Sequence, residues 1–194
     1  MRHGGTKLLE TERLILRPFR AEDGEAMFRN WAHDPEVTKY LTWQPHENAG
    51  ASHAIAALWE RESGKPDFYQ WAIVPRGQEE PIGSLSVVRL REDIDEAEIG
   101  YCMSKAYWGR GIMPEALKAV MDYLFDTAGM NRVSACHDAN NPKSGRVMEK
   151  AGMKREGTLR ASQRSNRGIV DMTVYSVLAE EWMRGEQEKR MQNA

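Results

Sequence analysis

A glycine-punctuated segment between positions 108 and 116 carries residue types that could bind an anion. It reads Trp108-Gly109-Arg110-Gly111-Ile112-Met113-Pro114-Glu115-Ala116, and a helical pattern begins directly after the second glycine. Closely spaced glycines leave the backbone uncrowded, so several N–H groups can point at one anion. The following helix adds the positive end of its dipole. The segment therefore predicts a diphosphate cradle whose donors are the amides of residues 109–113, because Pro114 has no N–H.

The spacing of this segment excludes two common phosphate-binding motifs. No G-x-x-x-x-G-K-[ST] motif is present, and Pro114 stands where a G-x-G-x-x-G motif needs its third glycine. The segment therefore indicates a coenzyme other than ATP or NAD. The alternative is an ordinary tight connection between a strand and a helix.

The elements that must position this turn follow from hydrophobic periodicity and turn residues. Strands are expected at 12–18, 69–73, 82–90, 97–103, 131–136, 153–159 and 169–178. Helices are expected at 21–32, around 51–58, from the glycine turn to 125, after Asn141-Pro142 to 151, and at 180–191. This order predicts one mixed α+β domain over residues 1–194. Its sheet is expected to be mostly antiparallel, with flanking helices and one parallel step through a right-handed crossover.

Composition narrows the class of protein. The chain has 194 residues and a formal net charge of −2, which argues against nucleic-acid binding. Its apolar runs are too short to span a membrane, and its first seven residues have no apolar core, so a cytoplasmic location is expected. Cys102 and Cys136 are expected to be reduced, buried thiols, and no metal site is predicted.

Four segments together resemble the GNAT superfamily of N-acetyltransferases, and its RimJ/RimL branch in particular. They are Glu12-Arg13-Leu14-Ile15-Leu16-Arg17, Glu98-Ile99-Gly100-Tyr101, the glycine segment 108–116, and Asn141-Pro142-Lys143-Ser144 with residues 147–153. The likeness covers roughly residues 9–182. The chain departs from the superfamily pattern [Q/R]-x-x-G-x-[G/A], with Trp108 in the first position and Met113 in the last. The Met113 side chain must therefore point away from the phosphates.

The resemblance implies a binding mode for acetyl-CoA. In this superfamily the fourth and fifth strands splay apart, here 97–103 and 131–136, and the pantetheine arm lies between them. The implied contacts are the main-chain groups of Tyr101, Cys102 and Met103, the segment Trp108, Gly109, Arg110, Gly111, Ile112 and Met113, and the side chains of Asn141 and Ser144. Asn141 and Ser144 could instead be helix N-caps, and Arg110 could be simply solvated.

The resemblance also implies candidates for catalysis. An ammonium has no lone pair, so the attacking amine needs a base, and Glu98 is the first candidate. Alternation places it on the face opposite Ile99, and its alternative is a solvent-facing carboxylate beside Glu96. Met148 stands where many members have an acidic Tyr, so Ser144 is the candidate acid for the departing thiolate. Gln163 cannot replace the base that some relatives carry near it.

The acceptor is the least determined part of the prediction. Trp43 and His46, in the aromatic loop 40–46, and Asp171, within an apolar strand, are the candidate acceptor contacts, although the loop residues could equally be core. The expected function is direct acetyl transfer to a primary amine, either a protein N-terminus, ribosomal by the branch name, or a small amine. The acids at 92–98 hint at polyamines, although surface solvation explains them as well, and antibiotics are a further class of small-amine acceptor. A catalytically silent acyl-CoA sensor is the alternative function. The resemblance also implies a possible homodimer.

Overall fold

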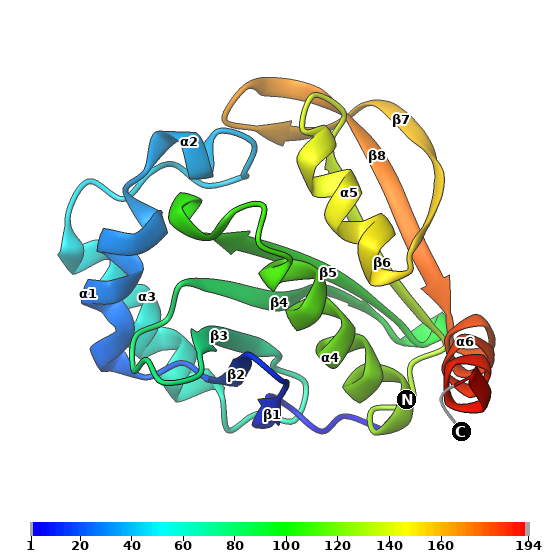
Figure 1. Ribbon diagram of the computed structural model, residues 1–194. Coiled ribbons are helices and arrows are strands. Elements are labelled where there is room, and N and C mark those ends of the chain that lie inside the picture. The colour runs from blue at the N-terminus through cyan, green and yellow to red at the C-terminus, as the bar shows by residue number, and fades with distance from the viewer. Residues whose placement is uncertain (1, 193–194) are drawn as a thin grey trace.

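A mixed eight-stranded sheet organises the protein (Figure 1). The computed structural model describes residues 2–192, and the side chains of residues 2–185. The strand order is β1-β2-β3-β4-β5-β6-β8-β7, and every pair is antiparallel except β5–β6. The bounds are β1 Leu9–Glu10, β2 Leu14–Pro18, β3 Gln70–Pro75, β4 Gly83–Arg91, β5 Glu96–Met103, β6 Arg132–Asp138, β7 Lys154–Ser165 and β8 Gly168–Leu178.

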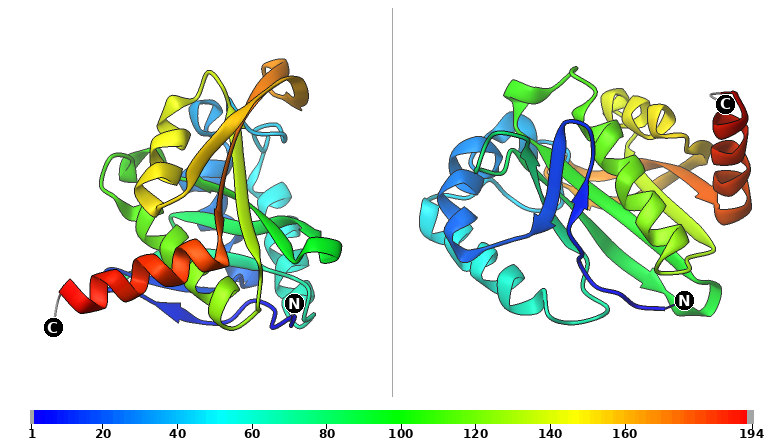
Figure 2. Two further views of the ribbon diagram at one scale, coloured as in Figure 1. Left: turned by 90° about the vertical axis from the view of Figure 1, so that its right-hand side faces the viewer. Right: turned by 60° about the horizontal axis from the view of Figure 1, so that its bottom comes forward.

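Helices cover both faces of this sheet (Figure 2). They are α1 Gly24–Met27, α2 Pro35–Thr38, α3 Ala49–Glu62, α4 Ile112–Asp126, α5 Pro142–Ala151 and α6 Ala179–Gln192. Short 3-10 turns, η1 Ala21–Asp23, η3 Glu92–Ile94 and η4 Lys105–Tyr107, and one π-helical turn, η2 Phe28–Ala32, connect them. No helix in the described range is both long and apolar enough to cross a bilayer.

The period-2 alternation of the central strands separates two layers of packing. Trp71, Leu85 and Ile99 are buried in the main core, which includes the apolar stripe of α4. Ala72 faces the other way and joins a second cluster with Met27 and Trp31 from α1 and η2. The site residues are therefore divided between two sides of one sheet.

The predicted α+β class, the antiparallel meander and the single parallel step are confirmed. Two predictions about elements were wrong. The segment 21–32 is a succession of 3-10, α and π turns rather than one helix. Strand β7 runs to Ser165, well beyond the predicted end at 159, because it pairs with β8 across two register shifts. Nearly all of β7 is exposed, so its sequence lacks the alternation that marks a half-buried strand.

The parallel pair β5–β6 is closed at one end only. Its register runs from Glu96↔Arg132 to Ile99↔Ala135, and beyond these residues the two strands diverge (Figure 1). The predicted splay is thus confirmed. It leaves one edge of each strand without a partner strand, and a ligand can occupy such edges.

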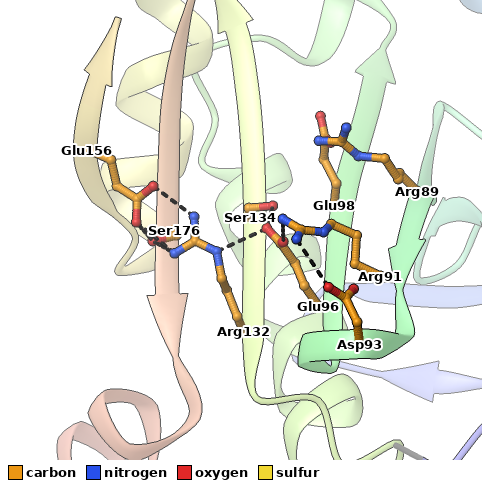
Figure 3. A network of polar contacts seen from close by, with 9 residues as sticks. All are labelled: Arg89, Arg91, Asp93, Glu96, Glu98, Arg132, Ser134, Glu156 and Ser176. Atoms are coloured by element: carbon orange, nitrogen blue, oxygen red, sulfur yellow. Dashed lines mark hydrogen bonds and ion pairs between the residues drawn. The ribbon is translucent and has the colours of Figure 1, made fainter. Parts of the chain in front are cut away.

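A polar network holds the closed end together (Figure 3). Glu96 is buried and accepts hydrogen bonds from Ser134 Oγ at 2.7 Å and Arg132 Nε at 3.0 Å. Burial opposes ionisation of Glu96, but these donors hold its pKa below the ordinary value. Arg132 also forms a bidentate pair with Glu156, at 2.7 Å for each bond, and this pairing lowers the pKa of Glu156 to about 2. The network therefore ties β5, β6 and β7 together opposite the open end.

Candidate active site

The protein has a cavity of about 1300 Å³ where β5 and β6 diverge. Pockets for a single small ligand usually measure about 300–1,000 Å³, so this cavity has room for two molecules. One part, the strand cleft, is bounded by β5, β6, the glycine turn 108–111 and α5. The other part, the aromatic chamber, lies among α1, α3 and the loop 39–48, and is lined by Met27, Trp31, Trp43, His46, Ile55 and Trp59.

The glycine turn has the backbone geometry of an anion cradle. Gly109 and Gly111 have φ values of 77° and 75°, in the left-handed region that favours glycine. The amides of residues 109–113 donate to no described group, and Glu115 is the first residue of α4 whose N–H bonds back, to the carbonyl of Gly111. The Met113 side chain is 3% exposed and packs in the core, so it points away from the turn as predicted. Five donors are thus left for a ligand.

An ion pair from the start of β2 braces this turn. Arg13 contacts the Glu115 carboxylate through Nε at 2.6 Å and Nη2 at 2.5 Å, and its Nη1 donates to the carbonyl of Arg110 at 3.0 Å. Thr11 Oγ1 donates to the same carboxylate at 2.6 Å. Burial opposes ionisation, but the hydrogen bonds from Thr11 and Arg13 lower the pKa of Glu115. This brace is not apparent from the sequence, because its partners lie about a hundred positions apart.

The main chain of β5 presents alternate residues to the strand cleft. The Ser104 N–H donates to the carbonyl of Ile82, and Cys102 lies opposite Ser84 in the antiparallel β4–β5 ladder. Alternation along this ladder turns the main-chain groups of Cys102 toward β4 and those of Tyr101 and Met103 toward the gap. The prediction that the Cys102 main chain faces the coenzyme was therefore wrong. Its thiol lies on the chamber side of the sheet, 3.4 Å from Ser84 Oγ.

Ser144 is coupled to Tyr101 across the strand cleft. The Tyr101 hydroxyl lies 2.9 Å from Ser144 Oγ and 3.1 Å from the Ser144 carbonyl oxygen. Burial raises the pKa of Tyr101 and so keeps this hydroxyl protonated. Met148 is 1% exposed and packs in the core. Ser144 and Tyr101 thus place two hydroxyl groups at this part of the site.

The N-cap residue and one face of α5 contribute an amide and three cations. Asn141 occupies the N-cap position, yet its side chain accepts no cap hydrogen bond and lines the cavity. Lys143, Arg146 and Lys150 also line the cavity. Their spacing of three and four positions places them on one helical face, a signal that the sequence analysis overlooked. This face suits a ligand with several phosphates.

Glu98 lies on the chamber side of β5, opposite Ile99 as predicted. Its side chain is 16% exposed, so it is not the solvent-facing carboxylate of the alternative. Arg89 pairs with it at 2.5 Å, and Cys136 Sγ donates to it at 3.3 Å. Burial, and then the charge of Glu98, raise the pKa of Cys136 to about 12. Cys136 is therefore a thiol at neutral pH and a poor nucleophile.

The other predicted contacts fall in three places. Trp43 and His46 line the aromatic chamber with ring centroids 5.4 Å apart, and burial lowers the pKa of His46, which favours neutral imidazole. The Trp108 indole donates to the Met103 carbonyl at 2.8 Å, and so joins the glycine turn to the end of β5. The Arg110 guanidinium lies 5.3 Å from the centre of the Tyr107 ring and does not line the cavity, which favours the solvated alternative.

The predicted inward position of Asp171 was wrong. The residue is exposed, and its carboxylate accepts the N–H of Ala161 at 2.8 Å. Ala161 has a φ of 46° inside the register shift of β7, so Asp171 supports an irregular turn of an edge strand. Asp171 therefore has a structural role on the surface.

Comparison with known proteins identifies the family of this site. The family model described as "Acetyltransferase (GNAT) domain" matches residues 13–154, and the chain belongs to this family of acetyl-CoA-dependent N-acetyltransferases. It is similar to the uncharacterized N-acetyltransferase YoaA of Bacillus subtilis (strain 168), with 33% identity over 88% of this chain and 96% of that protein. It is 24% identical to the [ribosomal protein uS5]-alanine N-acetyltransferase of Escherichia coli (strain K12), over 77% and 79% of the two chains. An acetyltransferase (GNAT family) structure from Bacillus anthracis has the same fold, with a TM-score of 0.80, 24% identity, and coverage of 90% and 100%.

Proposed function

We propose that this enzyme transfers the acetyl group of acetyl-CoA directly to a primary amine held in the aromatic chamber. The observation that carries the proposal is the set of five amides at residues 109–113 that donate to no described group, beside the open edge of β5. These amides would hold the diphosphate, assisted by the cations of α5. The main-chain groups of Tyr101 would hold the pantetheine arm, with the Asn141 amide nearby, while the carbonyl of Met103 accepts the Trp108 indole N–H.

The two catalytic candidates approach the gap from opposite sides. Glu98 lies on the chamber side of β5, while Ser144 lies on the α5 side, bonded to Tyr101. Acetyl-CoA supplies an acyl group activated as a thioester. The acceptor ammonium would lose one proton to solvent and attack as the neutral amine. Glu98 would accept the second nitrogen proton as the C–N bond forms, and the N–H of Met103 would stabilise the oxyanion. Ser144 donates a hydrogen bond to the sulfur as the C–S bond breaks, so the nitrogen proton is on Glu98 and the coenzyme leaves as a thiolate.

The acetyl group passes directly from the coenzyme to the amine, without an acetyl-enzyme intermediate. The raised pKa of Cys136 keeps it protonated, and Cys102, on the chamber side of β5, also has its pKa raised by burial to about 11. Neither thiol is therefore activated for attack. The proposed acceptor is a primary amine. Protein N-termini are one candidate class, because the Escherichia coli relative is a [ribosomal protein uS5]-alanine N-acetyltransferase.

The test combines binding with turnover. Calorimetry should detect acetyl-CoA binding to the wild-type chain, and a thiol-release assay should detect turnover with at least one member of a panel of primary amines. Ser144→Ala and Glu98→Gln should lower kcat while acetyl-CoA still binds. If acetyl-CoA bound but no amine of the panel caused thiol release, the transfer proposal would be overturned. If acetyl-CoA did not bind, the assignment of the cradle would be overturned.

A further inference from the structure

The aromatic chamber contains a buried donor that no described group uses. Trp31 is 0% exposed and lines the cavity, and its indole N–H has no hydrogen-bond partner among the described residues. Buried polar groups are nearly always paired in native proteins, so an orphan donor beside a cavity indicates an acceptor atom on a ligand. Trp43 and Trp59, both half-buried, add two more aromatic walls to the same chamber.

The charges of the cavity disfavour a polycation. Its acidic lining residues are Glu36, Glu98 and Asp138, and each already has a cation partner: Lys105, Arg89 and Arg167, respectively. The α5 face adds further positive charge to the cleft. A ligand with several ammonium groups would therefore have to displace a cation from each carboxylate that it used in the described lining, whereas a monoamine displaces only one.

The acidic stretch that hinted at polyamines lies elsewhere. Glu92 and Asp93 are not part of the cavity lining, and Glu96 is held in the network at the closed end of β5–β6 (Figure 3). Only Glu98 of this stretch reaches the cavity. The structure therefore removes the reason for favouring a polyamine.

We infer that the acceptor is a small monoamine whose body is aromatic and carries one hydrogen-bond acceptor. This inference rests on the proposed function, and it adds the substrate class. The ring of such a molecule packs against Trp43 and Trp59, and its acceptor atom takes the N–H of Trp31. Its single amine lies toward Glu98, where it displaces the exposed Arg89 side chain.

A panel of four amines tests this inference. Phenylalaninamide has the ring, the amine and a carbonyl acceptor, and phenethylamine lacks only the carboxamide. Spermidine is a polycation without a ring, and an alanine-initiated tetrapeptide represents protein N-termini. We expect kcat/KM for phenylalaninamide to exceed that for spermidine and for the tetrapeptide at least tenfold. It should exceed that for phenethylamine about fivefold. A preference for spermidine or for the tetrapeptide would overturn the inference and leave the proposed function intact.

Two variants assign the preference to the chamber. In Trp31→Phe the ring remains but the N–H is lost, so the advantage of phenylalaninamide over phenethylamine should disappear. Trp43→Leu removes a half-buried wall and should weaken both aromatic amines at least fivefold, with acetyl-CoA affinity unchanged. It also provides a test if Trp31→Phe unfolds. An unchanged ratio in a folded Trp31→Phe, or unchanged aromatic-amine kinetics in Trp43→Leu, would overturn the inference.

Calorimetric titration of the amines into CoA-saturated protein separates the two proposals. Selective binding of phenylalaninamide without acetyl transfer would overturn the proposed function and support the inferred ligand class. Acetyl transfer to amines without selectivity for phenylalaninamide would support the proposed function and overturn the inferred ligand class.

Discussion

Arg13→Gln is expected to weaken acetyl-CoA binding although Arg13 lies outside the cavity lining. The Arg13 side chain joins three parts of the structure: the start of β2, the Glu115 carboxylate in the first turn of α4, and the Arg110 carbonyl in the middle of the glycine turn. The substitution removes the hydrogen bond to the turn and the charge opposite Glu115. The amides of residues 109–113 then lose a fixed direction, and the coenzyme must order them when it binds.

The magnitude follows from exposure and from the number of bonds lost. The Arg13 side chain is 46% exposed and that of Glu115 is 20% exposed, so solvent screens the pair. A screened ion pair with a hydrogen bond to a carbonyl contributes about 1 kcal/mol to folding. Ordering the loosened turn costs a further ~1 kcal/mol on binding, which is about a fivefold increase in Kd.

Arg76→Gln is the matched control. The Arg76 side chain is 43% exposed, pairs with Glu10 at 2.9 Å and donates to the carbonyl of Thr11 at 2.8 Å. It thus has the same kind of partners in a similar environment, without contact to the glycine turn. Chemical denaturation should show a similar loss of stability in both variants. Calorimetry with acetyl-CoA should show weaker binding only in Arg13→Gln, and equal Kd values for the two variants would refute the reasoning.

Three further predictions concern the catalytic candidates and the closed end of the sheet. Glu98→Gln should lower kcat/KM by about 100-fold, the scale of a lost general base, with acetyl-CoA affinity unchanged in calorimetry; near wild-type turnover would exclude Glu98 as the base. Tyr101→Phe should lower kcat about fivefold through loss of the bond to Ser144, about 1 kcal/mol, and a change only in KM would contradict this. The folded pKa of Glu156, about 2, lies below its ordinary 4.5, so its stabilisation is complete above pH ~4.5 and is lost as pH falls toward 2. Glu156→Gln should therefore lower the unfolding free energy by about 1 kcal/mol at pH 7, because solvent screens the half-exposed pair, and by less at pH 3; equal losses at both pH values would be evidence against the pairing with Arg132.

The residues that the sequence predicted well are those whose constraints are local. Gly109 and Gly111 mark left-handed backbone because only glycine adopts it without strain, and Pro114 marks a first helical turn. The apolar face of α4 follows from its period, whereas the direction of Met113 follows from its bulk at a position where the family pattern has Gly or Ala. The antiparallel meander and the parallel step follow from element order, since short turns favour antiparallel pairing and a helix between two strands permits few topologies.

The errors and omissions concern contacts between distant segments. Asp171 was expected inside because its strand is apolar, yet register with β7 turns it to the surface. The main-chain groups of Cys102 were expected to face the coenzyme, yet they point toward β4, with which Cys102 pairs. The acids at 92–98 hinted at one acidic groove, yet only Glu98 reaches the cavity, while Glu96 belongs to the network at the closed end of β5–β6.

The sequence by itself therefore determined the left-handed glycine turn, the class of fold and the family, because backbone conformation and hydrophobic period depend on neighbouring residues. Only the tertiary structure decided which carboxylate reaches the cavity, that Arg13 braces the turn, and that the Trp31 indole N–H has no partner among the described residues. These properties depend on which groups meet after the chain has folded. An ion pair needs both partners in place, and a buried donor is known to lack a partner only when all of its neighbours are in place.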